Sequence, residues 1–481
     1  METKVKEKNI LTLKGKEINL TRLGIDFTLN EQQVELLNKV ADFLINKKDH
    51  SFTMSGYAGT GKSTLVRILL QWIKINFGHG YDFQITAPTN RAKYVIENLS
   101  GQKSRTIHSI LGLLPNINIE KLNLKNLKFD SRKKPQIPRN LLIIDESSMI
   151  NDTLLNTILD QTGRFNCQVL FIGDKAQLKP VEQEHISNVF ELDNKYELTK
   201  VERQKDGNPL TGILEDVRNN PYAETPPFEF KNVLNSKGEG IEFTNSSLNF
   251  LDNATESLKN VVFYTEYLNS RILTFTNARV ALYNKLIREK LGFSGEYHQG
   301  ELLMAYNNVG NNDYTDGLVN SCDYIIENKP EIEERTIGVT TLKGYSVNLV
   351  STDERNRLTQ FILSRDNEDN KFSDLAFHIE DLRYAAIYAK KRDEKVQYWK
   401  EYYRVSESFL SPKNLTVDGR TISSKSIDYG YAFTTHKSQG GTFKDVYVDY
   451  RDYQSCRDTE QRNQLLYVGL SRCTNKSVMF Y

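Results

Sequence analysis

Residues 52–70 read FTMSGYAGTGKSTLVRILL, and this stretch decides how the chain is interpreted. It contains a complete G-x-x-x-x-G-K-[ST] motif at 56–63, after a short apolar run typical of a strand and before an apolar helical pattern. Glycines let the backbone wrap closely around phosphate oxygens, and the positive end of the following helix adds to this attraction. A Gly-rich turn before a helix is the alternative. The flanking strand and helix favour a phosphate loop in a parallel α/β fold.

The bulk composition is that of an ordinary soluble protein. The chain has 481 residues, 38% hydrophobic content, 26% charged content and a net charge of +1, so any nucleic-acid contact must come from a local groove. As a prior, this length suggests about three domains. The four cysteines show no metal-binding spacing and are interpreted as reduced thiols. Neither a leader pattern nor a membrane-spanning apolar run is visible, and a cytoplasmic location is expected.

Apolar periodicity predicts α/β alternation in the first two hundred residues. A helix is expected at 29–46, and buried parallel strands are expected at 83–87, 141–144 and 169–172. Residues 111–138 interrupt this rhythm with a stretch rich in Asn, Lys, Leu and Pro, which predicts an inserted hairpin or small subdomain.

A second α/β region is expected from about residue 200. The pattern predicts a strand at 272–276 and a helix at 278–291, and then β texture over 300–350 that suggests a small antiparallel barrel. Further strands are predicted at 301–306, 323–326 and 336–340, one long helix at 374–403, and returning strands at 429–433, 446–448 and 477–480.

Polar residues at strand ends supply the remaining chemistry. Asp145 and Glu146 directly follow one predicted strand, where a parallel sheet presents side chains at its carboxyl edge. Next to a phosphate loop, Asp145 could hold magnesium together with Ser63, and Glu146 could activate water. Gln177 follows the next strand, where an amide can bond a γ-phosphate; an ordinary turn is the alternative there.

An ordered series of segments resembles the motifs of helicase superfamily one, in the 5′-to-3′ group of RecD-like and Dda-type phage enzymes. The resemblance spans nearly the whole chain. The segments are LNEQQ at 29–33 (Q motif), the phosphate loop (motif I), APT at 87–89 (Ia), TIHS at 106–109 (Ib), DESS at 145–148 (II), GDKAQLKPV at 173–181 (III), LTKVER at 198–203 (IV), TTHKSQG at 434–440 (V) and LYVGLSR at 466–472 (VI). Two departures from the usual pattern are Asn90-Arg91 after motif Ia and Ser147 in motif II, and neither removes a catalytic group.

The resemblance implies an α/β fold with two RecA-like P-loop parallel-sheet domains, an inserted pin subdomain and an inserted small SH3-like β-barrel subdomain. The implied divisions are 1–110 with 139–200 for the first RecA-like domain, 111–138 for the pin, 201–300 with 426–481 for the second RecA-like domain, and 301–425 for the barrel and helices.

It also implies an ATP-dependent DNA helicase that uses ATP and Mg²⁺. The implied catalytic residues are Lys62, Asp145, Glu146, Gln177, Arg203 and Arg472. Nucleotide contacts are expected from Gln33, Gly59, Thr60, Gly61, Lys62, Ser63, Thr64 and Gly440, with Ser63 and Asp145 at the metal. Single-stranded DNA is expected to contact Pro88, Thr89, His108, Thr434 and His436, because hydroxyls and imidazoles can bond phosphates without reading sequence.

The insert at 111–138 occupies the position of a strand-separating pin in this family, with Phe129 as the candidate tip aromatic. A local hydrophobic anchor is the alternative role for Phe129. The helical region 374–403 could brace the pin or DNA, although packing on the barrel is favoured.

Three other functions remain open from the sequence. The chain could be a translocase that needs a partner to unwind, a P-loop kinase or nucleotide switch, or a DNA-binding scaffold with an inactive site. The expected partners are single-stranded DNA, single/double-strand junctions and proteins of replication or recombination. The resemblance favours a monomer, and the choice between DNA and RNA is open.

Overall fold

The computed structural model places most of the chain. It describes residues 9–116, 128–131, 134–180, 183–200, 207–262, 270–310, 317–352 and 356–481. Within this part of the chain, no helix combines the length and apolarity needed to cross a membrane.

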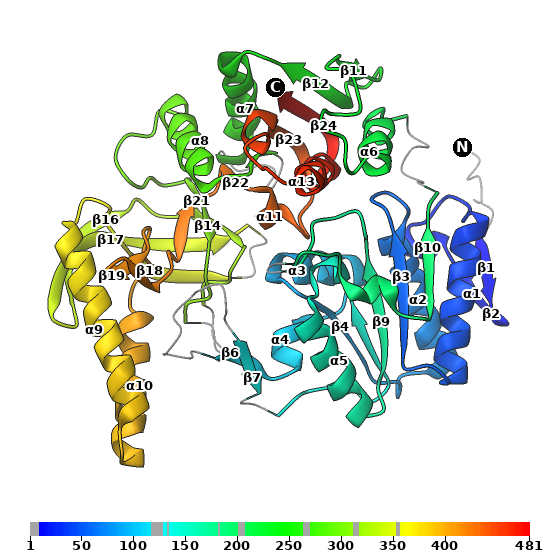
Figure 1. The fold of residues 1–481 in the computed structure, drawn as a ribbon, viewed down its shortest axis with the longest axis horizontal. Coiled ribbons are helices and arrows are strands. Elements are labelled where there is room, and N and C mark those ends of the chain that lie inside the picture. Colours follow the sequence, from blue (N-terminus) through cyan, green and yellow to red (C-terminus); the bar gives the residue numbers. More distant parts are fainter. Residues whose placement is uncertain are drawn as a thin grey trace, which may run out of the picture.

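The first domain is built on a six-stranded parallel sheet (Figure 1). Its strands lie in the order β10 (Lys195–Leu198), β3 (Ser51–Gly56), β9 (Gln168–Gly173), β8 (Leu141–Ile144), β4 (Phe83–Ala87) and β5 (Arg105–Thr106). The register is parallel throughout. Helices α1 (Glu31–Asn46), α2 (Lys62–Phe77), α3 (Asn90–Ser100), α4 (Ile107–Ile110) and α5 (Asp152–Arg164) complete the domain.

Alternation along the strands distributes the core over both faces of this sheet. Ile143 packs with α1 and α2, whereas the neighbouring Leu142 and Ile144 pack with α4 and α5. Because both faces are covered, the central strands β8 and β9 are buried at every position, as the sequence suggested. A two-stranded hairpin, β1 (Ile10–Leu13) and β2 (Lys16–Asn19), adds to the outer side of α2 and was not expected.

The second domain repeats this plan. Its strands lie in the order β11 (Val233–Leu234), β12 (Gly240–Thr244), β24 (Cys473–Phe480), β23 (Phe443–Asp449), β13 (Ser270–Thr274) and β22 (Ala432–Thr434), and only β11 runs antiparallel to its neighbour. The helices are α6 (Leu210–Asn219), α7 (Ser247–Val262), α8 (Asn277–Lys290), α11 (Thr435–Ser438), α12 (Tyr450–Tyr453) and α13 (Thr459–Ser471). Helices α7 and α8 share one core cluster, and α6 and α13 share another. The two sheets are therefore those of two RecA-like domains.

Between α8 and β22 the chain forms an antiparallel sheet. The strands are β14 (Leu302–Ala305), β15 (Asp323–Ile326), β16 (Glu331–Ile337), β17 (Thr340–Ser351), β18 (Arg357–Leu363) and β21 (Ile427–Tyr429). Residues 410–411 link β18 to β21, since Leu363 N donates to Leu410 O (2.9 Å) and Ser426 N donates to Ser411 O (2.8 Å).

Two local predictions in this region were wrong. Residues 336–340 are the tip of the β16–β17 hairpin, where Gly338 has φ +62° and the Val339 side chain is exposed. The predicted strand at 429–433 is divided at Gly430, with β21 in the antiparallel sheet and β22 in the second domain. Strand-like composition continued across both turns, so periodicity alone did not locate them.

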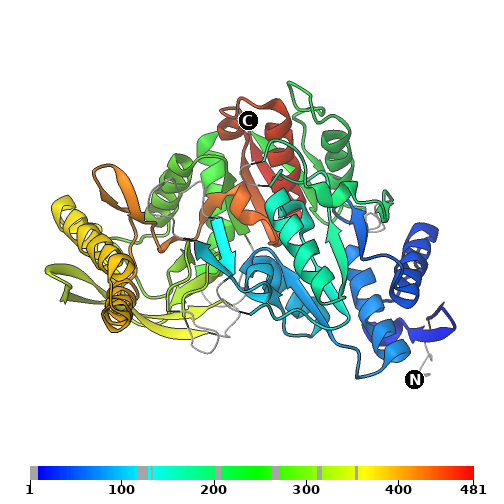
Figure 2. The same ribbon diagram turned by 60° about the horizontal axis from the view of Figure 1, so that its bottom comes forward.

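The single helix predicted at 374–403 is instead a hairpin of two helices, α9 (Asp369–Tyr388) and α10 (Arg392–Ser406). The backbone leaves the helical conformation at Ala389. Asp393 and Glu394 then lie in the first turn of α10, where they complement the helix dipole. No Gly or Pro marks this break in the sequence. The hairpin projects from the body at the lower left of Figure 1, and Figure 2 shows it at the opposite end of the molecule from the N-terminal hairpin. A short hairpin, β19 (Leu415–Val417) and β20 (Arg420–Ser423), packs on α9.

The insert in the first domain contains a second short hairpin, β6 (Leu113–Asn116) paired with β7 (Lys128–Ser131). Phe129 lies within β7, and its backbone pairs with Pro115. Residues 117–127, which connect the two strands in sequence and include no aromatic residue, lie outside the described residues. Phe129 thus stands in a paired strand of the insert, and its role at the pin and its contact with DNA stay predictions.

A buried ion cluster joins the three main parts of the molecule. The Asp323 carboxylate on β15 lies 3.3 Å from Arg91 Nη2 on α3 and 3.0 Å from Arg271 Nη2 on β13. All three side chains are nearly inaccessible to solvent. Arg91, which departs from the family pattern, therefore connects the first domain to the antiparallel sheet.

Candidate active site

The phosphate loop connects β3 to α2. Gly59 and Gly61 have φ values of +84° and +88°, a conformation that disfavours larger residues. A Cβ atom at Gly61 would lie 2.8 Å from Gln33 Nε2, so a larger residue would also have to displace the Gln33 amide. Lys62 is the first residue of α2, and its Nζ donates to the carbonyl oxygens of Gly56 and Tyr57.

Gln33 supports the loop from α1. Its side chain is buried, donates to Thr60 O at 3.1 Å and accepts from Asn30 N as part of a capping box. Gln33 lines the same cavity as Asp26 and Phe27. The predicted contact of Gln33 with an adenine base stays a prediction.

Asp145 and Glu146 stand at the carboxyl end of β8, as expected. Burial, followed by the neighbouring Glu146 carboxylate, raises the pKa of Asp145. Glu146 has φ +53°, a left-handed conformation that costs a non-glycine residue of order 1–3 kcal/mol. Such strain persists where the surroundings impose it, which is common at catalytic sites.

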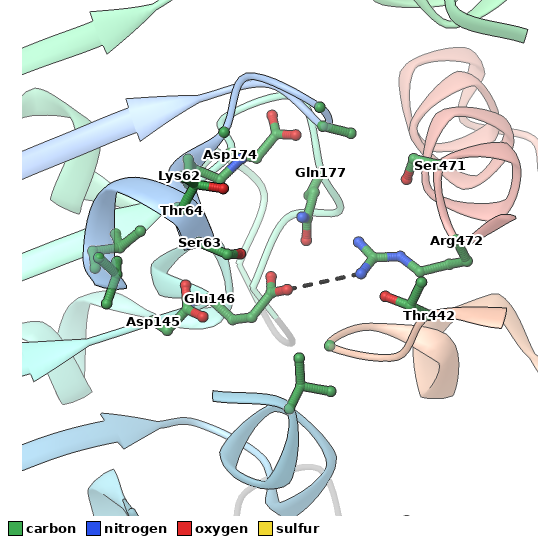
Figure 3. A pocket seen from close by; sticks show the side chains of 18 of the residues that line it. Lys62, Ser63, Thr64, Asp145, Glu146, Asp174, Gln177, Thr442, Ser471 and Arg472 are labelled. Atoms are coloured by element: carbon green, nitrogen blue, oxygen red, sulfur yellow. Dashed lines mark hydrogen bonds and ion pairs between the residues drawn. The ribbon is translucent and has the colours of Figure 1, made fainter. Parts of the chain in front are cut away.

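Arg472 reaches these carboxylates from the second domain (Figure 3). It directly follows α13, and its Nη1 lies 3.7 Å from Glu146 Oε1. With its amide oriented to satisfy both neighbours, Gln177 donates to Glu146 Oε2 at 3.1 Å and accepts from Arg472 Nη2 at 3.1 Å. The structure thus brings together Glu146, Gln177 and Arg472, three residues predicted from separate motifs.

These groups surround a cavity of about 750 Å³ between the two domains. Of the predicted residues, the cavity is lined by Gln33, Gly59, Gly61, Lys62, Ser63, Thr64, Asp145, Glu146, Gln177, Gly440 and Arg472. Thr60 is not among them, because its side chain turns inward and donates to Tyr57 O. Arg203 lies outside the described residues. Asp174, Thr442 and Ser471 also line the cavity and were not predicted individually.

The cavity fits a magnesium–nucleotide complex. Ser63 supplies a hydroxyl and Asp145 a carboxylate, and the described residues contain no cluster of three or more metal-binding side chains. A sparse set of hard oxygen ligands suits Mg²⁺, which normally keeps waters and binds substrate phosphates as well. With several phosphate-loop amides and two basic side chains nearby, the site can bind a nucleoside triphosphate and stabilise a transferring phosphoryl group.

The predicted DNA contacts lie on both domains and also have structural roles. Thr89 Oγ1 accepts from Ala92 N and caps α3. Pro88 is half-buried beside it, and His108 lies on α4, where burial lowers its pKa. Contact of these three residues with DNA stays a prediction.

On the second domain, Thr434 precedes α11 and His436 lies on it, with a pKa lowered by burial. Motif V then passes close over α3, since a Cβ atom at Gly440 would lie 2.7 Å from Ala92 Cβ. The segments predicted to bind DNA on the two domains therefore approach each other beside the cavity.

One cationic group here was missed from the sequence. Lys437 Nζ lies 4.1 Å from the centre of the Tyr306 ring, and Lys425 Nζ lies 4.0 Å from the same ring. Burial, followed by Lys425 and Arg91, lowers the pKa of Lys437 to about 8. Lys425 is paired with Asp428, whereas no carboxylate of the described residues lies within ion-pair distance of Lys437. The sequence feature that could have identified Lys437 was its position within motif V, residues 434–440.

Comparisons with known proteins match parts of both domains. Residues 28–225 match the family model described as an AAA domain, and residues 429–480 match the UvrD-like helicase C-terminal domain. The ATP-dependent DNA helicase dda of Enterobacteria phage T4 is 26% identical over 92% of this chain and 97% of its own length. The ATP-dependent RecD2 DNA helicase of Deinococcus radiodurans is 27% identical over 38% of this chain and 23% of its own. A crystal structure of Pif1 helicase from Candida albicans covers 95% of both chains at a TM-score of 0.48 and 18% identity.

The matched regions contain the phosphate loop, both carboxylates and Arg472, which the structure assembles around one cavity. The chain belongs to helicase superfamily one and is similar to the Dda and RecD2 helicases of that superfamily.

Proposed function

We propose that this chain is an ATP-dependent DNA helicase that moves 5′ to 3′ along single-stranded DNA and separates duplex strands. The observation that carries the proposal is the site shared by the two domains, in which Arg472 of one meets Glu146 and Gln177 of the other. Such a site is complete only when the domains are together, so a cycle of ATP binding and hydrolysis can drive their opening and closing.

Each residue has a defined role in the hydrolysis step. Lys62 pairs with the terminal phosphates, and Glu146 orients the attacking water and takes its proton. Arg472 stabilises charge on the transferring phosphoryl group, which makes it an arginine finger. Gln177 links Glu146 to Arg472 and so connects the state of one domain to the other. Mg²⁺, held by Ser63 and Asp145, would neutralise charge on the phosphates.

DNA would cross both domains along the segments that carry Thr89 and His436, with Lys437 as an additional phosphate contact. Phosphate contacts of this kind are insensitive to sequence. In the same proposal, the domains divide as the sequence predicted, the β6–β7 insert acts as the pin, and the antiparallel sheet at 301–350 forms an SH3-like barrel. The hydrogen bonds through residues 410–411 support a closed barrel. Action as a monomer in the cytoplasm, in replication or recombination, is part of the proposal.

The test is ATP-dependent strand displacement on two matched duplexes, one with a 5′ single-stranded tail and one with a 3′ tail. Unwinding from the 5′ tail alone is expected, with Lys62→Ala as the inactive control. Unwinding from the 3′ tail would refute the polarity. ATPase activity stimulated by single strands without any unwinding would instead indicate a translocase that depends on a partner. ATPase activity unaffected by DNA would indicate a kinase or nucleotide switch, and matched RNA substrates separate DNA from RNA preference.

A further inference from the structure

A tyrosine of the second domain is hydrogen-bonded to the phosphate loop of the first. Tyr467 lies on α13, and its hydroxyl accepts from Ala58 N at 3.0 Å. The same hydroxyl donates to Asp174 Oδ2 at 2.8 Å. Ala58 belongs to the phosphate loop, and Asp174 directly follows β9. A single hydroxyl group thus holds two loops of the first domain.

The Tyr467 side chain and the Asp174 carboxylate are both buried, so the loss of either hydrogen-bond partner is costly. The Tyr467 side chain is 2% exposed and Asp174 is 1% exposed. A buried carboxylate is costly unless donors surround it, and Tyr467 and the Ala176 N–H, at 2.9 Å from Oδ1, are its donors here. Removing the hydroxyl would leave both the loop amide and the carboxylate short of a partner.

Two other contacts join the same surfaces at a more exposed rim. The Arg218 guanidinium of α6 lies 3.8 Å from the centre of the Tyr57 ring. Lys179 Nζ lies 2.7 Å from Glu460 Oε2 on α13. Partly exposed pairs of this kind contribute little to stability. The Tyr467 hydroxyl, in contrast, is buried and accepts a hydrogen bond from a backbone amide of the phosphate loop.

Tyr467 lies on the helix that leads directly to Arg472. Arg472 follows five residues later, about 7.5 Å along the helix axis. We propose that Tyr467 is a positioning residue: by fixing α13 against the phosphate loop, its hydroxyl sets Arg472 against Glu146 and Gln177. The inference rests on the proposed ATPase function. Beyond that function, the inference names the contact that aligns Arg472, which is the hydrogen bond between the Tyr467 hydroxyl and the phosphate loop.

The test replaces the hydroxyl alone, with Tyr467→Phe. The matched control is Tyr447→Phe, because the Tyr447 hydroxyl also makes two hydrogen bonds, to Asn253 O and Ser257 Oγ, but within the second domain. At saturating single-stranded DNA, Tyr467→Phe is expected to lower kcat by about 10- to 100-fold, since small misalignments of reacting groups cost this much. The KM for ATP should stay within about threefold, and Tyr447→Phe should leave both values unchanged.

A double-mutant cycle with Arg472→Lys tests whether Tyr467 acts through the arginine. The effect of Tyr467→Phe on kcat is expected to shrink to less than about threefold in that background, because residues that act as a unit are not additive. Hydrogen exchange supplies a readout independent of turnover. The amide of Ala58 should exchange faster in Tyr467→Phe than in the wild type or in Tyr447→Phe, without added nucleotide.

Three results would overturn the inference: equal losses of kcat in both backgrounds, a raised KM with unchanged kcat, or unchanged exchange at Ala58. A wild-type protein without ATPase activity would contradict the proposed function instead. The exchange measurement would still decide whether the hydroxyl holds the loop.

Discussion

Replacing Asp323 by Asn tests how the three parts of the molecule are joined. The amide keeps the size of the side chain and removes its charge. Arg91 and Arg271 would then face each other in a buried site without a carboxylate between them. Burial already lowers the pKa of Arg271 despite the presence of Asp323. The change therefore leaves uncompensated positive charge on side chains that are almost inaccessible to solvent.

The expected loss in the free energy of unfolding follows from the number of buried charges that are left unpaired. Breaking a buried ion pair by removing one partner costs about 3–5 kcal/mol, and Asp323→Asn should fall in this range. Arg91→Gln leaves Asp323 paired with Arg271, so no buried charge loses its last partner. The hydrogen bonds of Arg91 to Asp323 and to Ser321 O are lost, at about 1.5–3 kcal/mol. Asp323→Asn is thus predicted to lose more stability than Arg91→Gln, in addition to the predicted size of each loss.

Urea denaturation followed by circular dichroism measures both variants against the wild type. A triple variant, Asp323→Leu with Arg91→Met and Arg271→Met, is expected to recover most of the loss, because apolar side chains of similar volume replace the cluster without unpaired charge. A loss below about 1 kcal/mol for Asp323→Asn, or a larger loss for Arg91→Gln, would refute the reasoning.

Three further predictions concern the proposed activity. Arg472→Ala should lower the DNA-stimulated kcat by about 10³-fold or more in a coupled ATPase assay, and a loss below tenfold would exclude an arginine finger. Affinity for single-stranded DNA, measured by fluorescence anisotropy, should decrease as pH rises through about 8, because Lys437 beside Lys425 and Arg91 is charged below its pKa and neutral above it. Lys437→Arg should flatten this dependence, since arginine stays charged; an unchanged profile would remove Lys437 from the DNA path. Phe129→Ala should slow strand displacement and spare the DNA-stimulated ATPase, and equal losses in the two assays would refute the pin assignment.

The amino-acid sequence was sufficient for many of the strands and for the catalytic motifs of this protein. Strands at 83–87, 141–144 and 323–326 were predicted to the residue, because each is a short, mainly apolar run with polar or turn-forming residues on either side. The phosphate loop and the acidic pair after β8 were equally readable, since their chemistry depends on residue type at fixed short spacing. The order of the motifs was then enough to identify the family.

Only the tertiary structure decided which distant residues meet. Tyr467 and Ala58 are 409 positions apart, and Arg91 and Asp323 are 232 positions apart. Neither pair leaves a periodic signal, because each depends on how two sheets and an inserted subdomain pack against one another. The break between α9 and α10 has the same origin: residues 389–391 lack a helix breaker, and the packing of two helices side by side determines the turn. Local sequence preference thus specifies most helices and strands and the catalytic residues at their ends. The contacts of buried charged and hydroxyl groups between the domains specify how those catalytic residues are aligned with one another.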